Sequence, residues 1–265
     1  MTRQITSPSN PLIKEVRKLR NKKDRDLSQS FYVEGIQAVG KAINSGYEVQ
    51  YIIYCPDLLN SEYGYRLIEN LPKDFPGLIE VTRDVFNLFA LKEGPQGLAA
   101  IVIQKWFNLS EVKSIGDIWI ALDSIQDPGN VGTILRSLDA IGGEGAILLG
   151  QTTDAYHPSS VRASTGAIFT QKLIRSDARD FRSCINLSGF SVVGAVCGGG
   201  QNYRKYNYPS DLILLMGSEQ KGLSGEYMAI CNALVTIPIE GHVDSLNVAV
   251  AASLILFEIF NQKRG

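Results

Sequence analysis

Apolar positions in the first hundred residues repeat with two different periods. Leu12, Val16 and Leu19 form an apolar stripe at helical spacing, and Asn10 followed by Pro11 is typical of a helix start. The other elements predicted in this part are helices at 35–45, 63–70 and 83–90 and strands at 49–54, 78–81 and 98–103. Alternating helices and strands predict a small α/β unit.

A second series of elements begins at residue 118. It comprises predicted strands at 118–122, 146–149, 191–196, 212–216 and 233–237 and predicted helices at 131–141, 160–169, 180–187 and 246–261. Alternation on this scale predicts a mostly parallel sheet with helices on both faces. Residues 105–116 have no clean period, so we expect a linker there, between domains at 1–104 and 117–265.

The last predicted helix is apolar on nearly every side. From Asn247 to Phe260 its polar residues are Asn247, Ser253 and Glu258. A helix of this kind must be buried nearly all round. We therefore expect it to pack in the core or against another subunit.

Composition narrows the class of protein. The chain has 265 residues, of which 45% are hydrophobic, which is enough for two domains with packed cores. It has no apolar run of the roughly 18 residues that a membrane span needs, and its first residues do not resemble a secretory signal. Four cysteines without a CxxC pair favour reduced thiols in the cytoplasm over disulfides or a metal site.

Charge is unevenly distributed along the chain. The net charge is −1, yet residues 1–26 hold eight basic and three acidic side chains. Such a basic segment predicts a local contact with a polyanion, although a solvated helix face explains it equally well. The candidate contact residues are Lys14, Arg17, Lys18, Arg20, Lys22 and Lys23.

Other nucleotide-binding and hydrolytic motifs fit poorly. Residues 142–145 are glycine-rich, but a strand follows them rather than a helix, and residues 197–200 precede a poor helix opener and are interpreted as a flexible loop. The chain has no GxxxxGK[ST] sequence, which disfavours a P-loop enzyme. His157 and His242 lie apart from any nucleophile motif, so we interpret both as ordinary loop residues.

Three polar segments adjoin apolar strands of the second series, at residues 123–136, 214–224 and 237–247. Each places polar groups at a strand end, where open α/β sheets bind ligands. On local grounds, Asn130 and Ser245 can each cap the start of the helix that follows. Gly217 lets the backbone approach a ligand closely.

These segments resemble the three motifs of the SpoU (TrmH-type) family of RNA ribose 2′-O-methyltransferases. The matching stretches are Asp127-Pro-Gly-Asn-Val-Gly-Thr-Ile-Leu-Arg136, Gly217-Ser-Glu-Gln-Lys-Gly222 and Ser245-Leu-Asn247. Gln220 replaces a commoner glycine. Residues 161–169 also resemble the family, and residues 31–35 and 96–100 resemble, more loosely, its ribosomal-protein-like substrate-binding domain.

The resemblance implies a fold and a chemistry. It implies an α/β fold of the SPOUT type, with a C-terminal deep trefoil knot that binds S-adenosylmethionine, and a homodimer acting on RNA. By position in the motifs, the implied catalytic residues are Arg136, Asn130, Glu219, Ser245 and Asn247. The implied cofactor-binding residues are Gly217, Ile237, Leu246, Pro238 and Gly222, and no metal is implied.

The resemblance also implies that the basic segment at residues 1–26 contacts RNA, with ribosomal RNA favoured over transfer RNA. The guanidinium of Arg136 stays protonated in proteins and therefore cannot accept a proton as a base. We expect it to hold a phosphate or the 2′-oxygen instead. Three alternatives stay open: the same chemistry on transfer RNA, a catalytically silent RNA-binding module of the same fold, and methylation of a base atom.

Overall fold

The computed structural model describes residues 3–91, 93–112 and 117–264, and these divide into two compact units. Unit 1 contains the chain up to Lys105 together with Tyr156–Phe169. Unit 2 contains Trp106–Ala155 and the chain from Thr170 onward. The segment at 156–169 therefore leaves the second predicted domain and packs on the first. The predicted domain boundaries otherwise stay a prediction.

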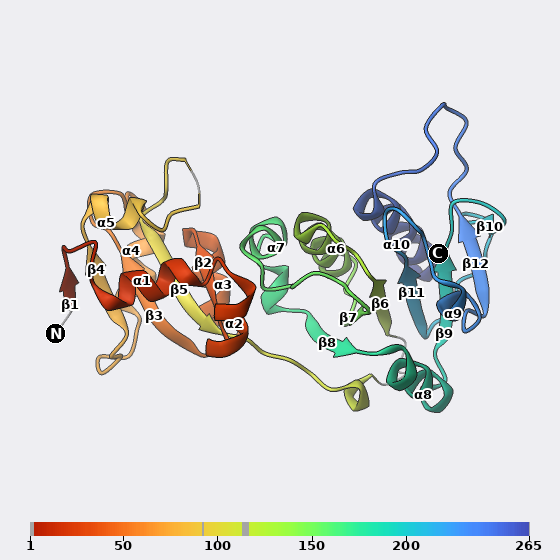
Figure 1. Cartoon of the computed structure of the whole chain (residues 1–265), viewed down its shortest axis with the longest axis horizontal. Helices are drawn as coiled ribbons and strands as arrows, with labels where there is room; N and C mark the ends of the chain where they lie inside the picture. Colours follow the sequence, from red (N-terminus) through yellow and green to blue (C-terminus); the bar gives the residue numbers. More distant parts are fainter. Residues whose placement is uncertain (1–2, 92, 113–116, 265) are drawn as a thin grey trace. The chain divides into compact units, whose positions relative to one another are not determined.

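Unit 1 is built on a five-stranded mixed sheet of order β1-β4-β3-β5-β2 (Figure 1). Its strands are β1 (Arg3–Ile5), β2 (Ser30–Glu34), β3 (Val49–Tyr54), β4 (Leu78–Val81) and β5 (Leu98–Ile103). Its helices are α1 (Pro11–Lys18), α2 (Lys22–Ser28), α3 (Ile36–Asn44), α4 (Glu62–Glu69), α5 (Arg83–Asn87) and α7 (Pro158–Ala163), with a 3-10 turn η2 (Ala167–Phe169). β1, β4 and β3 run parallel, whereas β5 is antiparallel to both β3 and β2.

The predicted stripe explains how α1 docks on this sheet. Asn10 caps the helix by accepting the Leu12 N–H at 2.9 Å, and Pro11 occupies the first turn. Leu12, Val16 and Leu19 are buried in one core with side chains of the sheet. Burying about three such side chains favours folding by several kcal/mol, at about 1.5–3 kcal/mol each.

Unit 2 contains a seven-stranded sheet of order β10-β12-β9-β11-β6-β7-β8, in which every described strand pair is parallel. Its strands are β6 (Ile118–Asp123), β7 (Gly145–Leu149), β8 (Lys172–Ser176), β9 (Ser191–Ala195), β10 (Gln201–Asn202), β11 (Leu212–Met216) and β12 (Ala233–Thr236). Its helices are α6 (Pro128–Ala140), α8 (Ala178–Ser188), α9 (Gly225–Met228) and α10 (Val248–Arg264), with a 3-10 turn η1 (Leu109–Glu111). The predicted mostly parallel α/β fold is confirmed. The trefoil knot stays a prediction, since strand order alone does not define a knot.

Helices cover both faces of this sheet. On one face Trp119, Ile147 and Ile213 pack with side chains of α8 and α9. On the other face α6 contacts β7 and α10 contacts β11, and the two helices pack against each other. The Ser137 and Ser253 hydroxyls join them at 2.7 Å.

Several local predictions were wrong. The helix predicted at 160–169 is divided into α7 and η2, because Thr165 and Gly166 between them have positive φ angles of 48° and 94°. The helix predicted at 83–90 ends at Asn87, and β2 and β8 were not predicted as strands.

The last helix, α10, is not buried all round in the single chain. Val250, Leu254 and Phe257 remain 49%, 40% and 44% exposed. The core of the single chain therefore does not cover this helix completely, and packing of its exposed side against another subunit stays a prediction.

The predicted linker is anchored to unit 2. Phe107 forms an isolated parallel bridge with Ile174, and the Arg175 guanidinium lies 3.7 Å from the centroid of the Trp106 ring. Asn108 and Glu111 then form a capping box around η1. Residues 113–116 of the predicted linker lie outside the described residues.

Candidate active site

All three polar segments follow strands of the same parallel sheet in unit 2. The first follows β6, the second follows β11 and the third follows β12. These strands run parallel, in the order β12-β9-β11-β6, so their carboxyl ends meet at one edge. This is where open α/β sheets bind ligands.

Side chains of the three segments are joined by hydrogen bonds. The Asn130 Nδ2 donates to Glu219 Oε1 at 2.9 Å, and the Asn247 Nδ2 donates to Asn130 Oδ1 at 3.0 Å. Asn130 is the middle residue of the three and is only 9% exposed. Asn130 lies 89 positions before Glu219 and 117 positions before Asn247 in the sequence. We call these three hydrogen-bonded residues the Asn130 chain.

The helix caps differ from the local prediction. α6 begins at Pro128, and its cap is Asp127, whose Oδ1 accepts the Gly129 N–H at 2.7 Å. Because proline presets the backbone for a first helical position, the helix begins early, and Asn130 lies inside it. The predicted capping role of Asn130 was wrong, and its side chain is used by the Asn130 chain instead.

A similar shift occurs at α10. The Asn247 Oδ1 accepts the backbone N–H groups of Ala249 and Val250, at 2.9 and 3.3 Å. Asn247 is therefore the cap, and the capping role predicted for Ser245 was wrong. The side chain of Asn247 uses its oxygen for the cap and its nitrogen for Asn130, so one residue fixes the helix start to the polar chain.

A cavity of about 530 Å³ lies beside the Asn130 chain. It is lined by the loops after β9, β11 and β12, and then by the start of α10. Of the predicted residues, Gly217, Gly222, Ile237, Leu246, Glu219 and Ser245 line it. Pro238 is exposed and lies outside this lining, and Asn130 and Asn247 reach the cavity only through their hydrogen bonds.

The glycines of the second segment shape its loop. A Cβ on Gly217 would lie 2.2 Å from the backbone of both Gly222 and Leu223, so Gly217 allows the loop to close on itself. Ser218 and Gly222 exchange two backbone hydrogen bonds across that closure, at 2.9 and 3.1 Å. Gly222 has φ 65°, which favours glycine. Close packing of the loop is one reason for glycine at position 217, and its predicted close approach to a ligand stays a prediction.

The loop after β9 was missed as a site element. Cys197 and Gly198 line the cavity, although the sequence suggested only a flexible loop. The glycines at 198–200 closely follow a predicted strand, and this position at a strand end could have indicated a site element. The Gln126 N–H was missed as well: it donates to Glu219 Oε2 at 3.5 Å, opposite the Asn130 contact.

Arg136 lies apart from the Asn130 chain. It follows Asn130 by six residues on α6, which places it about a third of a turn around the helix. Its side chain is exposed and forms no hydrogen bond or ion pair with any residue that the structure describes. The guanidinium is therefore available to an external ligand.

Two further groups near the site are protonated at neutral pH. Burial raises the pKa of Tyr227 to about 12, and the nearby Asp123 carboxylate adds to this effect. Burial also raises the pKa of the Cys231 thiol to about 11. Within the described ranges, no cluster of three His, Cys, Asp or Glu side chains could hold a metal ion.

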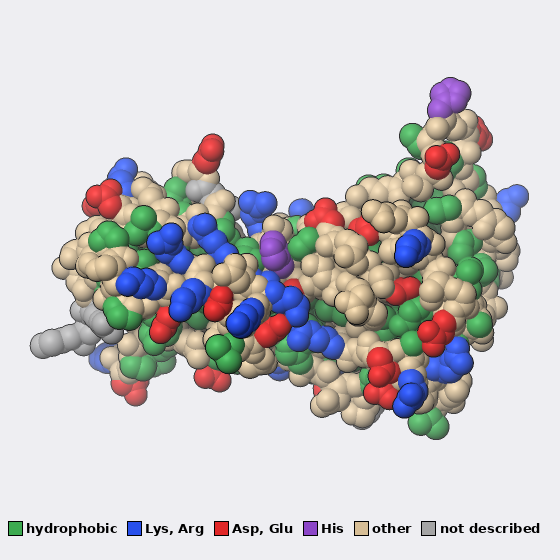
Figure 2. Space-filling view, viewed as in Figure 1, with side chains coloured by type: hydrophobic (Ala, Val, Ile, Leu, Met, Phe, Trp, Pro, Cys, Tyr) green, Lys and Arg blue, Asp and Glu red, His purple; other side chains and the backbone are tan. Residues whose placement is uncertain are grey.

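The predicted RNA-contact residues lie on α1 and α2 or next to them, and all six are exposed. Figure 2 shows Lys and Arg side chains gathered over the face of unit 1 that these helices form. Lys22 pairs with Asp26 at 2.8 Å, and Arg20 donates to the Ala90 carbonyl at 3.1 Å. The remaining cations are Lys14, Arg17, Lys18 and Lys23, and no ion pair with a described residue involves them.

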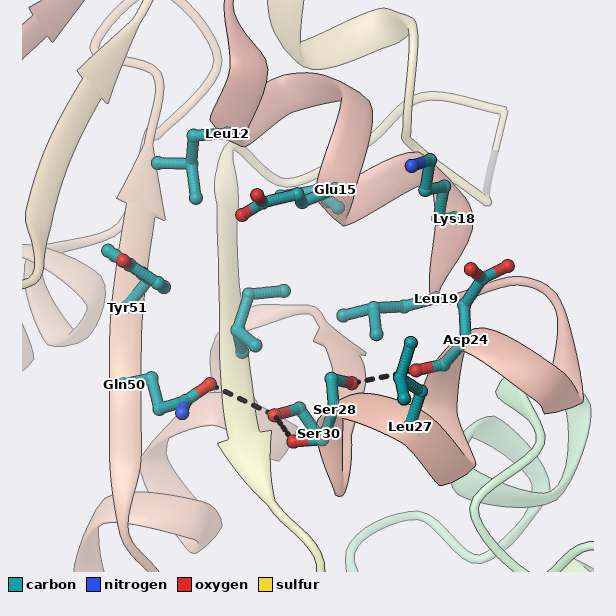
Figure 3. Close-up of a pocket in the computed structure, with 12 residues that line it drawn as sticks. Leu12, Glu15, Lys18, Leu19, Asp24, Leu27, Ser28, Ser30, Gln50 and Tyr51 are labelled. Atoms are coloured by element: carbon teal, nitrogen blue, oxygen red, sulfur yellow. Dashed lines mark hydrogen bonds between the residues drawn. The ribbon is translucent and has the colours of Figure 1, made fainter.

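An apolar groove of about 250 Å³ adjoins this surface, between α1, α2 and the strands β3 and β5 (Figure 3). Leu19 and Ile101 line it, and the Ser30 hydroxyl donates to Gln50 Oε1 at 3.0 Å. Glu15 and Asp24 also line it, so the groove itself is unsuited to a phosphate.

Comparison with known proteins gives the family. The chain matches the SpoU rRNA Methylase family over residues 117–257 and the MRM3-like substrate binding domain over residues 10–100. It belongs to the SpoU rRNA Methylase family. The predicted resemblance is confirmed, and the second match corresponds to the predicted N-terminal substrate-binding domain.

Relatives of this SpoU-family chain are similar over nearly its whole length. A 23S rRNA (guanosine(2553)-2′-O)-methyltransferase, RlmP of Bacillus subtilis, is 26% identical over 97% of this chain and 99% of its own. A 23S rRNA (uridine(2479)-2′-O)-methyltransferase of Streptomyces viridochromogenes is 29% identical over 92% of this chain and 87% of its own.

A solved structure is similar in both units. The AdoMet-bound rRNA methyltransferase of Sinorhizobium meliloti is 34% identical to this chain, with a TM-score of 0.88. The match covers 98% of each chain.

Proposed function

We propose that this chain is an S-adenosylmethionine-dependent RNA methyltransferase that methylates a ribose 2′-hydroxyl in ribosomal RNA. The observation that carries the proposal is the Asn130 chain, which joins side chains from all three family motifs beside one cavity. The names of the relatives, which are ribosomal RNA 2′-O-methyltransferases, support the same chemistry.

The cavity suits the cofactor. Its volume lies within the range of about 300–1,000 Å³ that is typical of small-molecule sites. Met216, Leu223 and Val235 offer apolar surface to a flat adenine, and the carboxylates of Glu219 and Asp244 offer negative charge to a cationic ligand. When bound, S-adenosylmethionine supplies an electrophilic methyl group on a sulfonium.

The protein's own residues would position the sugar. Glu219 is held from two sides, by the Asn130 side chain and by the Gln126 N–H, so its carboxylate has a fixed direction. With Ser245 and Asn247 it would orient the ribose, and such positioning is worth several kcal/mol of the barrier. RNA is the natural substrate, because DNA lacks the 2′-hydroxyl.

Arg136 would hold a phosphate or the 2′-oxygen and stabilise the negative charge that develops there. A guanidinium does not release its proton in proteins, so a phosphate or water takes the proton from the 2′-hydroxyl. The absence of any ion pair or hydrogen bond between Arg136 and the described residues leaves it available for this contact.

Substitution of Arg136 tests the mechanism. Arg136→Ala should lower methyl transfer to ribosomal RNA by about a hundredfold or more, the usual effect of losing one charge-stabilising donor. The affinity for S-adenosylmethionine, measured by calorimetry, should stay within about twofold. Arg179→Ala on α8, also an exposed arginine of unit 2, is the control and should be active. Unchanged transfer by Arg136→Ala would refute the assignment.

The substrate and the site of methylation are tested together. Total RNA from cells with and without the protein is cleaved with alkali, which a 2′-O-methyl group blocks at its linkage. One protected position in ribosomal RNA supports the proposal, and a protected position in transfer RNA contradicts it. Failure of the wild-type protein to bind labelled S-adenosylmethionine would instead favour a silent RNA-binding module.

We also propose that the protein is a homodimer formed through α10. Val250, Leu254 and Phe257 recur at helical spacing and make one exposed apolar stripe. Covering this stripe with a second copy would bury the helix all round. Light scattering should give twice the chain mass at micromolar concentration, and Leu254→Asp should give a monomer. Leu187→Asp, at an apolar residue that is 89% exposed on α8, should leave the dimer intact.

We place this activity in the cytoplasm, where thiols stay reduced, in agreement with four cysteines that are all free. None of the helices within the described ranges is long and apolar enough to cross a membrane.

A further inference from the structure

A second pocket, of about 280 Å³, lies within unit 1. Three stretches of chain form its walls: the junction of β2 and α3, Leu91 and Gln96 before β5, and the segment that carries α7. Tyr32, Leu91 and Val161 supply apolar surface, and Glu34 and Arg162 supply opposite charges. This combination of apolar walls and a few polar groups is typical of ligand sites.

The α7 segment is fastened to the rest of unit 1. The Tyr47 hydroxyl donates to the Ile168 carbonyl at 3.1 Å, and the Lys41 Nζ donates to the Thr165 carbonyl at 3.0 Å. The rings of Phe31 and Tyr156 pack with centroids 4.4 Å apart. These contacts hold Val161 and Arg162 against the β2–α3 junction, so the pocket is already formed in the chain without a ligand.

The carboxylate of Glu34 is only half satisfied. Its Oε2 accepts the Leu91 N–H at 2.6 Å and the Tyr32 hydroxyl at 3.3 Å. Its Oε1 is buried and has no hydrogen-bond partner. Burial raises the pKa of Tyr32, so its hydroxyl stays a donor to Glu34. A buried carboxylate oxygen without a partner is costly, and because Glu34 lines the pocket, its negative charge favours a ligand that carries an N–H donor.

Arg162 lines the same pocket and does not neutralise Glu34. The guanidinium is exposed and forms no ion pair or hydrogen bond with any described residue, Glu34 included. The first turn of α3 adds partial positive charge: Gly35 caps the helix without a side chain, which leaves the N–H groups of Gln37 and Ala38 uncapped at the pocket wall.

The ligand must therefore carry both an anion and an N–H donor. A simple anion would be repelled by Glu34, and a simple cation by Arg162. A nucleotide has a phosphate at one end and N–H donors on its base at the other. Proteins that read RNA take up such unstacked nucleotides in pockets with apolar walls and polar edges.

We propose that this pocket binds one unstacked nucleotide of the substrate RNA, with its phosphate at Arg162 and the α3 N-terminus and a donor of its base at Glu34. The inference rests on the proposed function for the identity of RNA as the ligand. It assigns base recognition to a site in unit 1 that is separate from the exposed cations of α1 and α2.

Arg162→Ala tests the phosphate contact, with Arg66→Ala on α4 as the matched control, since both are exposed arginines of unit 1. The probe is a fluorescein-labelled, single-stranded RNA 12-mer of mixed sequence, and binding is measured by anisotropy over a range of salt concentrations. Arg162→Ala should weaken binding by about tenfold and lower the slope of log affinity against log salt by about one. Arg66→Ala should change neither quantity.

Glu34→Gln tests the base contact, because glutamine keeps an oxygen for the Leu91 N–H. We expect binding to weaken by about threefold to tenfold with the salt slope unchanged, since no phosphate contact is lost. Thermal melting by circular dichroism confirms that both variants are folded. Arg162→Lys, which keeps the charge, should recover most of the affinity lost in Arg162→Ala.

Methyl transfer separates this proposal from the proposed function. With unmodified ribosomal RNA as substrate, Arg162→Ala should raise the KM for RNA and leave kcat and cofactor affinity unchanged. A lowered kcat with an unchanged KM would overturn the pocket assignment, as would an unchanged affinity and salt slope in folded Arg162→Ala. If the wild-type protein transfers no methyl group, the proposed function fails, and the anisotropy results still decide whether the pocket binds RNA.

Discussion

The Asn130 chain in unit 2 and the Glu34–Arg162 pocket in unit 1 use their polar groups in opposite ways. Asn247, Asn130 and Glu219 are hydrogen-bonded to one another, so each has a fixed orientation before any ligand arrives. Glu34 and Arg162 line one pocket without pairing. Pre-paired groups suit chemistry, which depends on geometry, whereas unpaired charges suit recognition, because the ligand supplies their partners.

The two sheets explain why the sites are built differently. In unit 2 the strands run parallel, so the loops after β6, β11 and β12 meet at one edge and their side chains can bond to each other. The sheet of unit 1 is mixed, and its strand ends are divided between two edges. A pocket there needs a wall from elsewhere, and the α7 segment supplies it.

Breaking the Asn130 chain should have the largest effect on catalysis. Asn130→Ala removes the donor to Glu219 and the acceptor for Asn247 at once, so transfer should fall by roughly a hundredfold to a thousandfold. Single-turnover assays with saturating cofactor measure this loss. Asn261→Ala, at an exposed position on α10, is the control and should be fully active. Near-normal transfer by Asn130→Ala would show that pre-pairing is irrelevant to the chemistry.

Cysteine alkylation sharpens the assignment of the cavity beside that chain. The pKa of Cys231 is raised to about 11 by burial, so on the order of one thiol in a thousand is thiolate at pH 8. Cys197 is exposed, so iodoacetamide should alkylate it faster than Cys231, as measured by mass spectrometry.

The pH dependence of cysteine alkylation and its protection by the cofactor complete that test. The thiolate fraction of Cys231 grows about tenfold per pH unit up to its pKa, so its alkylation should accelerate about a hundredfold from pH 8 to pH 10. Because Cys197 lines the cavity, S-adenosylmethionine should protect it. Unprotected Cys197 at saturating cofactor would place the cofactor elsewhere.

Asn247 allows its two roles to be separated. Asn247→Ala loses both the cap and the bond to Asn130, so stability should fall by about 1 kcal/mol and transfer by about tenfold. Asn247→Asp keeps an oxygen for the cap and loses the donor to Asn130. Its urea midpoint should stay close to that of the wild type while transfer falls, and equal losses of stability in both variants would contradict this separation.

Substitution of Gly222 should have the smallest effect on stability, and Gly198 is its matched control. A Cβ at either position meets no atom within 4 Å, but only Gly222 has a positive φ, of 65°. Gly222→Ala should lower the free energy of unfolding by about 1 kcal/mol through backbone strain alone. Gly198→Ala should be neutral to within about 0.5 kcal/mol. Urea denaturation measures both, and equal values would show that the loop relaxes.

Local patterns in the sequence predicted most elements of the fold. The start of α1 at Pro11, the bounds of β3, β4 and β5 and the parallel sheet of unit 2 follow from short-range preferences and apolar spacing. The family motifs also placed polar groups after β6, β11 and β12. These features are set by neighbouring residues, whose interactions are the same wherever the segment lies.

Tertiary structure alone decided which partner each polar side chain takes. Asn130 and Ser245 both suit a helix cap locally, yet Asp127 and Asn247 provide the caps. Asn130 instead forms hydrogen bonds with Glu219 and Asn247, which lie 89 and 117 positions further along the chain. Glu34 and Arg162 meet in one pocket although 128 positions separate their numbers. No local pattern encodes such contacts, because their free energy depends on how packing brings distant segments together and removes water between them.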